Sequence, residues 1–257
     1  MSDLPELLPK HQKIVLTVLK FILTTLLILF LTIPLRAEWS WGIFSGKAFT
    51  SNSDLKIVQP SKGNNLLFKD VKYKDRSFET PLYYGIRLGY FLSSHPHFGW
   101  EAEFIHAKIY SDADQMVKVS GTKNGEFFDQ TILLGENVQS FSMSHGLNFL
   151  FFNLVGRYGL LKKGPEDKVQ ILGRIGIGPV IPHVESTING ISKEQFEIQG
   201  PAFQAALGTE IHLWRGLSWL LEYKFTYANI KNAKIPSGTA QTKTQTNHLT
   251  FGLGGRF

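Results

Sequence analysis

The last ten residues of the chain, His248-Leu-Thr-Phe-Gly-Leu-Gly-Gly-Arg-Phe257, decide its fold. In an extended strand, Leu249, Phe251, Leu253 and Phe257 share one face, and the opposite face carries small or polar side chains. A strand that is apolar on one face, polar on the other and ends in an aromatic residue is typical of the strand that closes an outer-membrane barrel. An ordinary half-buried strand is the alternative, and the rest of the chain must decide between the two.

The composition narrows the class of protein. The chain has 257 residues and a mild formal net charge of +6, with no basic stripe carrying interleaved aromatics. We therefore expect no nucleic-acid partner, and a basic surface facing anionic lipid or lipopolysaccharide is the better use of the charge. Because the chain has no cysteine, disulfides, thiol catalysis and thiolate metal sites are excluded.

The N-terminus predicts export. Lys10, Lys13 and Lys20 precede an apolar run over residues 21–35, and Ala37 then offers a small-residue cleavage site. We interpret residues 1–37 as a bacterial secretory signal peptide and residues 38–257 as the mature barrel domain. An uncleaved anchor is the alternative, since the apolar run counted from Ile14 is about long enough to span a bilayer. No later apolar segment has that length, so a mature chain in a membrane would cross it as strands.

The mature sequence alternates between amphipathic strands and turn-rich gaps. The predicted strands cover about residues 38–50, 81–92, 98–111, 141–158, 168–184, 196–213, 217–231 and 245–257. The gaps at 93–97, 159–167 and 214–216 are short, and those at 51–80, 112–140, 185–195 and 232–244 are long. This alternation predicts an all-β fold, an eight-stranded antiparallel up-and-down transmembrane barrel whose short turns are periplasmic.

Side-chain parity and the tryptophans support a membrane barrel. In the seventh predicted strand, Trp219, Leu221 and Tyr223 alternate with the polar residues Glu222 and Lys224. Alternation alone does not say which face meets water. All the tryptophans, however, lie near strand ends beside the short turns, as in an interfacial aromatic girdle: Trp39, Trp41, Trp100, Trp214 and Trp219.

The strand positions expected to face the barrel interior include several charged side chains, which we predict to form an ionic core. An eight-stranded barrel is too narrow for a water channel, so side chains fill it, and buried charges there must pair. A pore function is therefore disfavoured. The predicted core residues are Arg87, Glu101, Glu103, Arg157, Arg174, Glu210, Glu222, Lys224 and Arg256.

Four histidines, His106, His145, His183 and His248, are predicted near the outer mouth, and no chemistry is expected of His95, His97 and His212 near the short turns. Imidazoles beside carboxylates such as Glu185 bind a metal or act as general acid and base. His145 and His248 share the parity of Arg157 and Arg256 and are expected to point inward. His106 and His183 have the opposite parity and would look outward unless a bulge shifts the register. Neighbouring polar side chains are Lys108, Tyr110, Asp112, Asp114 and Asn148.

Several segments resemble the lipid A oxidase family of outer-membrane barrels. They are Phe68-Lys-Asp-Val-Lys-Tyr-Lys-Asp-Arg-Ser-Phe78, Tyr83-Tyr-Gly-Ile-Arg-Leu-Gly-Tyr90, Gly99-Trp-Glu-Ala-Glu-Phe-Ile-His-Ala-Lys-Ile-Tyr110, Ser144-His-Gly-Leu-Asn-Phe149, Ile181-Pro-His-Val-Glu185 and Thr246-Asn-His248. The resemblance implies oxidation of the proximal glucosamine of lipid A to 2-aminogluconate, with dioxygen as co-substrate.

The resemblance implies a role for the residues predicted near the outer mouth. Because lipid A sugars lie at the height of the outer mouth, an outward side chain there can reach them. We expect a catalytic set of His106, His183, Glu185, His145 and His248, in which His106 and His183 bind or deprotonate the sugar or hold a divalent metal and Glu185 orients His183. Lys74, Arg76 and Lys108 are the expected contacts to lipid A phosphates.

Two other functions remain open. One is lipid A deacylation at a His/Ser/Glu site, for which Ser142, Ser144 and His145 are close in sequence; adjacent residues Ser144 and His145 should point to opposite faces, which weakens this alternative. The other is a non-enzymatic barrel that stabilises the envelope or presents loops. The expected partners are outer-membrane lipid, lipid A and, during insertion, the barrel-assembly machinery.

Overall fold

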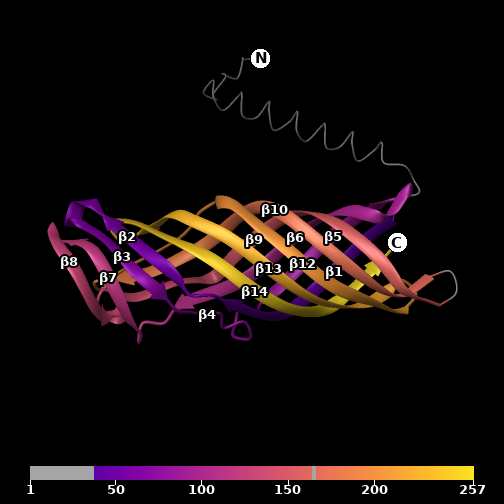
Figure 1. Cartoon of the computed structure of the whole chain (residues 1–257), viewed down its shortest axis with the longest axis horizontal. Helices are drawn as coiled ribbons and strands as arrows, with labels where there is room; N and C mark the ends of the chain where they lie inside the picture. Colours follow the sequence, from indigo (N-terminus) through magenta and orange to yellow (C-terminus); the bar gives the residue numbers. More distant parts are fainter. Residues whose placement is uncertain (1–37, 164–165) are drawn as a thin grey trace, which may run out of the picture. The chain divides into compact units, whose positions relative to one another are not determined.

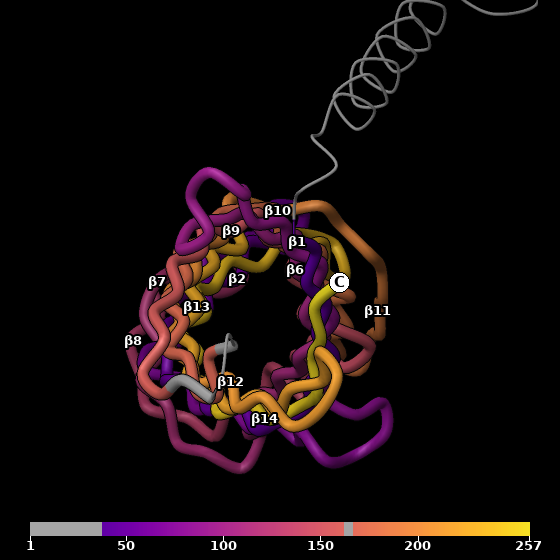
Figure 2. The backbone as a smooth tube through the Cα atoms, turned by 90° about the vertical axis from the view of Figure 1, so that its right-hand side faces the viewer, coloured from indigo at the N-terminus to yellow at the C-terminus, as the bar shows by residue number. Residues whose placement is uncertain are grey.

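A computed structural model describes residues 38–163 and 166–257, and the predicted signal peptide lies outside these residues. Cleavage after Ala37 stays a prediction. Eight of the described strands form a ring in which each pairs antiparallel with the next in chain order, and the last pairs with the first (Figure 2). They are β1 (Glu38–Thr50), β5 (Tyr84–Leu92), β6 (His95–Ser111), β9 (Val138–Lys163), β10 (Glu166–Ile188), β12 (Gln199–Trp214), β13 (Leu217–Ile235) and β14 (Gly238–Arg256).

The last ten residues of the chain close the barrel as predicted, because they pair with the first strand. The pairing of β14 with β1 runs from Arg256 opposite Ser40 to Thr246 opposite Thr50. The final residue extends this ladder, because Phe257 N donates to Trp39 O at 3.0 Å and Trp39 N donates to Phe257 O at 2.9 Å. The barrel is therefore sealed up to the last residue of the chain.

Deletion of Phe257 should impair assembly of the barrel in the membrane. The deletion removes two backbone hydrogen bonds from the seam together with the aromatic side chain of Phe257. The measurement is the fraction of heat-modifiable, folded protein in the membrane. Phe257→Tyr keeps the backbone and the aromatic ring and serves as the control. Normal insertion of the deletion variant would contradict this role of the terminus.

The eight predicted strands are confirmed, and several are longer than the sequence indicates. The first has the predicted bounds, whereas β9 begins three residues before its predicted start and β14 begins seven residues earlier than expected, at Gly238. The extra length lies mostly at one end of the ring, which we call the long-loop end; the opposite, short-turn end carries the tight connections such as Arg215-Gly216. No helix of residues 38–163 or 166–257 is long and apolar enough to cross a membrane.

The long gaps predicted at 51–80 and 112–140 do connect ring strands, and each contains a hairpin that the sequence analysis did not predict. These hairpins continue the sheet past the long-loop end in the order β14, β2, β3, β7, β8 (Figure 1). Asn124-Gly125 turns the second hairpin, with positive φ at both residues as a tight hairpin requires. The additional elements are β2 (Ser53–Gln59), β3 (Asn64–Val71), β4 (Tyr73–Lys74), β7 (Met116–Lys123), β8 (Glu126–Leu133), β11 (Ile191–Phe196) and the 3₁₀ turns η1 (Pro60–Lys62) and η2 (Leu134–Glu136).

The two faces of the ring strands differ as the alternation predicts. On β13, Trp219, Leu221 and Tyr223 are exposed on the outside, while Glu222 and Lys224 are buried inside. The interior is apolar towards the long-loop end, where buried Phe, Ile, Leu, Val and Met side chains of the ring and the hairpins form one cluster. The wall is therefore apolar outside, and polar side chains on its outward face call for an explanation.

Six of the predicted core charges meet in the middle of the barrel. Arg174 Nε lies 3.0 Å from Glu101, Arg87 lies 3.1 Å from Glu222, and Arg174 also pairs with Glu222. Lys224 pairs with Glu103 and lies 3.2 Å from Glu222. Each of these side chains is at most 5% exposed, and the three cations face three carboxylates. The predicted pairing is confirmed for these six, and their packing agrees with a filled interior.

Candidate functional site

Polar side chains gather on the outward face of β6, β9 and β10, just past the apolar part of the wall. Strand register orders them into rows that run across the strands. The first row joins Tyr84, His106, Asn148 and Ile181. Four residues further along β6 and β10, towards the long-loop end, Tyr110, Ser142 and Glu185 form another row, with Glu194 of β11 beside Glu185. His183 lies between these rows.

A bulge in β9 brings His145 to this face. Between the pairs Pro182–Leu147 and Glu185–Ser142, β10 has two residues and β9 has four. The extra residues lie at Gly146, whose φ of +129° suits glycine, and the side chain of His145 is 64% exposed. The inward direction that parity gives His145 is therefore wrong. The expectation that Ser144 and His145 point to opposite faces is also wrong, since the side chains touch at 3.0 Å.

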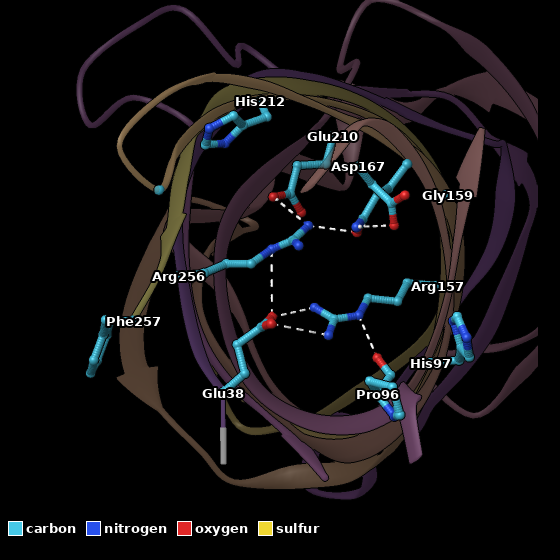
Figure 3. A pocket seen from close by; sticks show the side chains of 12 residues that line it. Glu38, Pro96, His97, Arg157, Gly159, Asp167, Glu210, His212, Arg256 and Phe257 are labelled. Carbon is cyan, nitrogen blue, oxygen red and sulfur yellow. Dashed lines mark hydrogen bonds and ion pairs between the residues drawn. The ribbon is translucent and has the colours of Figure 1, made fainter. Parts of the chain in front are cut away.

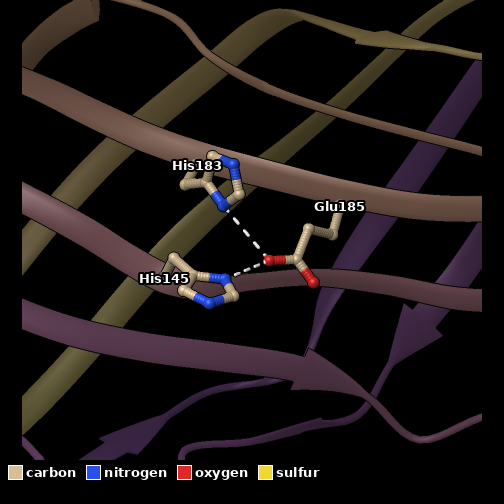
Figure 4. Close-up of side chains that lie close together, drawn as sticks. All are labelled: His145, His183 and Glu185. Carbon is tan, nitrogen blue, oxygen red and sulfur yellow. Dashed lines mark hydrogen bonds and ion pairs between the residues drawn. The ribbon is translucent and has the colours of Figure 1, made fainter. Parts of the chain in front are cut away.

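Glu185 joins three side chains, which together with it we call the wall cluster: Ser144, His145, His183 and Glu185. His145 Nδ1 lies 2.5 Å from Glu185 Oε1, and Ser144 Oγ donates to the same oxygen. His183 Nδ1 lies 3.1 Å from it, and the rings of His145 and His183 meet edge to face (Figure 4). The sequence predicted His145, His183 and Glu185 near the mouth, and the structure brings them into contact with one another and with Ser144.

The wall cluster is partly roofed. Phe196 of β11, which lies outside the ring (Figure 2), packs on His183 with 4.1 Å between ring centroids. As a result His183 is only 8% exposed. Its Nδ1 is buried and makes no hydrogen bond with good geometry to a described residue, although Glu185 Oε1 is close enough to form an ion pair with a protonated His183. A buried, unpartnered imidazole nitrogen beside a carboxylate is an available ligand position.

His106 has a defined tautomer. Asn148 Nδ2 donates to Ile181 O at 3.2 Å, so Asn148 Oδ1 must accept from His106 Nδ1 at 2.8 Å. The proton of neutral His106 is thus on Nδ1, and Nε2 carries a free lone pair. This nitrogen is buried and makes no hydrogen bond within the described part of the chain. His106 is therefore arranged as a proton acceptor on the row next to the wall cluster.

The three expected phosphate contacts lie around the long-loop side of the site, each with a partner of its own. Lys108 is buried, and its Nζ donates to Glu79 O at 2.7 Å. Lys74 lies 3.0 Å from Asp112, and the Arg76 guanidinium stacks on the Tyr110 ring at 4.3 Å. A phosphate would have to share or displace these partners.

His248 is separated from the wall cluster. It is fully buried inside the barrel, where its Nε2 lies 2.8 Å from Thr226 Oγ1 and its ring lies beside Tyr83. The inward parity predicted for His248 is confirmed. A place for His248 in a site on the outward wall is therefore wrong, and we leave it out of the catalytic set.

A second polar site lies at the short-turn end. A cavity of about 470 Å³ contains Arg157, Arg256 and Glu210, the three predicted core charges that do not join the central network (Figure 3). Arg256 lies 2.7 Å from Glu210 and 3.6 Å from Glu38, and Arg157 pairs with Glu38. The sequence analysis missed Glu38, which is the first residue after the predicted cleavage site. Both cations are neutralised, so this cavity is a weaker candidate than the wall cluster.

The donor set of the wall cluster fits a metal ion. One ligand atom each from His145, His183 and Glu185 can lie within 4.8 Å of the others. Two imidazoles and one carboxylate form the facial set that holds non-haem iron in enzymes that use dioxygen. The orphaned Nδ1 of His183 supports this fit, because a bound cation would give that nitrogen a partner. The wall cluster can therefore hold the divalent metal expected from the sequence.

Comparisons with known proteins identify the architecture. The sequence model of the outer membrane protein beta-barrel domain matches residues 23–257. Neisserial surface protein A is similar in structure (TM-score 0.39, 9% identity, covering 86% of this chain and 99% of that one), as is OprG from Pseudomonas aeruginosa (0.38, 14%, 86% and 94%). Ail of Yersinia pestis, solved with the heparin analogue sucrose octasulfate, has a TM-score of 0.34 at 9% identity and covers 86% and 97%. No curated protein sequence matches the chain.

Proposed function

Because the chain belongs to the outer membrane protein beta-barrel family and lies in the bacterial outer membrane, we propose that its wall cluster oxidises lipid A. The observation that carries this proposal is the direction of the cluster: His145, His183 and Glu185 meet on the outside of the barrel. Short turns are periplasmic in such barrels, so the long-loop end faces the cell exterior. A lipid in the outer leaflet can then reach the cluster from the side.

The height of the cluster on the wall suits a glycolipid headgroup. Along β10, the exposed apolar residues Ile175 and Ile177 are followed by His183 and Glu185. Acyl chains lie against an apolar wall, whereas sugars lie where polar side chains begin. A proximal glucosamine at the hydrocarbon boundary would therefore meet the imidazoles and the carboxylate.

The reaction follows the resemblance to lipid A oxidases. Oxidation to 2-aminogluconate requires a free hydroxyl at C1 of the proximal glucosamine, so the substrate is lipid A without a phosphate at that carbon. Oxidation to the lactone removes the hydrogen on C1 as a proton and two electrons, and it removes the proton of the C1 hydroxyl. Dioxygen takes up the two electrons and two protons to form hydrogen peroxide, and water opens the lactone to the acid.

The residues of this chain have distinct tasks in that reaction. The free Nε2 of His106 accepts the proton of the C1 hydroxyl. His145, His183 and Glu185 would hold the metal, which would supply the redox chemistry between the sugar and dioxygen. Ser144 donates to Glu185 and fixes the direction of its carboxylate. Arg76, Lys74 and Lys108 are the groups proposed to meet phosphate.

Lipid A deacylation is the second candidate, favoured by the contact of Ser144 with His145. A hydrolytic triad needs the serine on one imidazole nitrogen and the carboxylate on the other, so that the proton can pass through the ring. In this site both Ser144 Oγ and Glu185 Oε1 approach Nδ1 of His145. This geometry favours the metal-dependent oxidation.

The purified barrel in detergent micelles tests the proposal. With dioxygen and lipid A that has a free C1 hydroxyl, we expect one hydrogen peroxide per 2-aminogluconate formed, and a chelator should stop both. Release of a fatty acid without peroxide would identify a deacylase. No reaction at all, with iron(II) added, would indicate the non-enzymatic barrel, which stabilises the envelope or presents loops.

Gly146→Ala should lower the oxidation rate while the barrel stays folded. An alanine Cβ at this position would lie 2.4 Å from the Asn148 amide, and φ of +129° is strained for any residue but glycine. The bulge must then shift His145, and misplacing a catalytic group by about 1 Å costs about 10²-fold in rate. Gly125→Ala, at a positive-φ turn in the β7–β8 hairpin with open space around it, is the matched control. Equal rates for both variants would contradict a role for the bulge.

A further inference from the structure

A pocket of about 320 Å³ lies at the long-loop end and shares no lining residue with the wall cluster. It is formed where the β2–β3 hairpin, the tip of the β7–β8 hairpin, the start of β9 and the β10–β11 turn meet (Figure 1). The volume is at the lower end of the range of about 300–1,000 Å³ that is common for ligand pockets. Because the long-loop end faces the cell exterior, this pocket, which we call the mouth pocket, meets molecules outside the cell.

Backbone hydrogen bonds hold these turns together. Gly125 N donates to Gly63 O at 3.0 Å and joins the tip of the β7–β8 hairpin to the β2–β3 hairpin. Asn189 N donates to Asn137 O at 3.2 Å and joins the β10–β11 turn to the residue before β9. The walls of the mouth pocket are therefore in place before any ligand arrives, which lowers the cost of ordering them on binding.

Carboxamide side chains dominate the polar lining, and they fall into two groups. Gln59 and Asn64 are structural, because Asn64 Nδ2 donates to Gln59 Oε1 at 2.9 Å and Gln59 Nε2 donates to Pro236 O at 2.7 Å. The side chains of the second group make no hydrogen bond within the described part of the chain: Asn124, Asn137 and Asn189. These three carboxamides are free to bind a ligand.

Asn137 shows what kind of group the mouth pocket lacks. The residue is only 7% exposed, and its backbone is already used, because its N–H donates to Leu134 O and its C=O accepts from Asn189. Its side-chain carboxamide nevertheless has a donor and an acceptor without partners, and nearly buried polar groups normally have partners. A ligand group with one N–H donor and one C=O acceptor would satisfy both.

The floor and the charges of the pocket narrow the ligand further. The apolar floor residues Ile57, Leu66 and Ile188 are each 2–4% exposed, so they offer a patch for a methyl group and not for an acyl chain or an aromatic ring. Lys123 and Glu136 are the charged lining side chains, and their charges are opposite. The lining therefore suits a neutral ligand with an amide and a methyl group.

We propose that the mouth pocket binds a neutral sugar that carries an acetamido group, as found in glycan chains outside the cell. The acetamido N–H donates to the Asn137 carbonyl and its C=O accepts from the Asn137 amide, while its methyl group rests on Leu66 and Ile188. Asn124 and Asn189, exposed at the rim, then meet the ring hydroxyls. This binding is independent of any chemistry at the wall cluster.

Calorimetry with the purified barrel in lauryldimethylamine oxide, a detergent without sugar, compares N-acetylglucosamine, glucose and glucosamine. We expect N-acetylglucosamine to bind about tenfold or more tightly than the other two, which lack the acetamido group. Asn137→Leu keeps the bulk of the side chain but removes both hydrogen bonds, and it should weaken N-acetylglucosamine binding about tenfold. Asn65→Leu, at an exposed position of β3 outside the pocket, is the matched control and should bind as the wild type does. Equal affinities for the three probes, no binding of N-acetylglucosamine, or equal affinities of Asn137→Leu and wild type would overturn the proposal.

Whole cells show where the acetamido sugar comes from. A fluorescent polymer that carries many N-acetylglucosamine groups is bound to cells with full-length or truncated lipopolysaccharide, since many weak contacts add up to measurable binding. If the cell's own lipopolysaccharide fills the mouth pocket, truncation should increase binding of the polymer; equal binding to both cells assigns the pocket to a glycan from outside. His183→Ala should bind the polymer as the wild type does, whether or not lipid A is oxidised. Binding to neither cell, or equal binding to cells with the Asn137→Leu variant, would overturn the proposal.

Discussion

Lipid A oxidation should fall by about 10²- to 10⁴-fold when His183 is replaced by alanine, the range for loss of an acid–base or metal-holding group. His183 has a buried Nδ1 that lies 3.1 Å from Glu185 Oε1 without making a well-aligned hydrogen bond to any described residue. Its removal leaves His145 and Glu185, which are too few to hold a metal firmly. The measurement is the rate of 2-aminogluconate formation by the purified barrel.

Two further variants make this result specific. Glu185→Gln keeps the shape of the side chain but removes its charge, and it should reduce oxidation to a similar extent. His97→Ala, at the cavity of the short-turn end, should leave the rate unchanged. Full activity of folded His183→Ala and Glu185→Gln proteins would remove the wall cluster from the reaction.

The second large effect is on stability: Glu222→Gln should destabilise the barrel by about 3–5 kcal/mol. Glu222 is 2% exposed and contacts three cations, Arg87, Arg174 and Lys224. Without its charge, three buried cations share the two remaining carboxylates of the network, and an uncompensated buried charge is costly. The measurement is the free energy of unfolding in detergent micelles, from denaturant titration.

An exposed ion pair supplies the control for this stability effect. Asp129→Asn breaks a surface pair with Lys118, whose side chain is 61% exposed, and should cost less than about 1 kcal/mol. Comparable losses for Glu222→Gln and Asp129→Asn would mean that the central network does not hold the interior together.

Local patterns carried most of the information about the ring. Alternation of period two predicts that Trp219, Leu221 and Tyr223 point outward. The reason is that one face of a barrel strand meets lipid and the other meets the polar interior. The same parity correctly turns His106 and His183 outward. It fails at His145, since two extra residues of β9 at Gly146 are accommodated by the neighbouring strands, and nothing local in the sequence marks that register shift.

The hairpins that extend the sheet are marked in the sequence by turn dipeptides, which the sequence analysis did not use. Asn124-Gly125 and Asn189-Gly190 are tight-turn dipeptides, and both form hairpin turns with positive φ. They would have indicated the β7–β8 hairpin and the return of β11. The contact of β11 with His183, by contrast, depends on which edge β11 pairs with, and pairing between distant segments is set by the whole barrel.

The position of the site follows from these two features together. The bulge turns His145 outward, and β11 brings Phe196 over His183. In a regular eight-stranded wall without the bulge and without β11, His145 would point inward and Phe196 would not cover His183. A barrel wall that is apolar below and carries a roofed histidine–carboxylate cluster above is the feature on which we base the proposal that the cluster acts on a membrane lipid.

Mass spectrometry of lipid A from otherwise identical cells tests the central claim most directly. The cells contain the wild-type protein, the His145→Ala/Glu185→Gln variant at the same membrane level, or no protein. We predict that a lipid A species with one added oxygen atom, on the proximal glucosamine, occurs with the wild type alone. Identical lipid A in all three, or loss of an acyl chain with the wild type, would contradict oxidation of lipid A by the wall cluster.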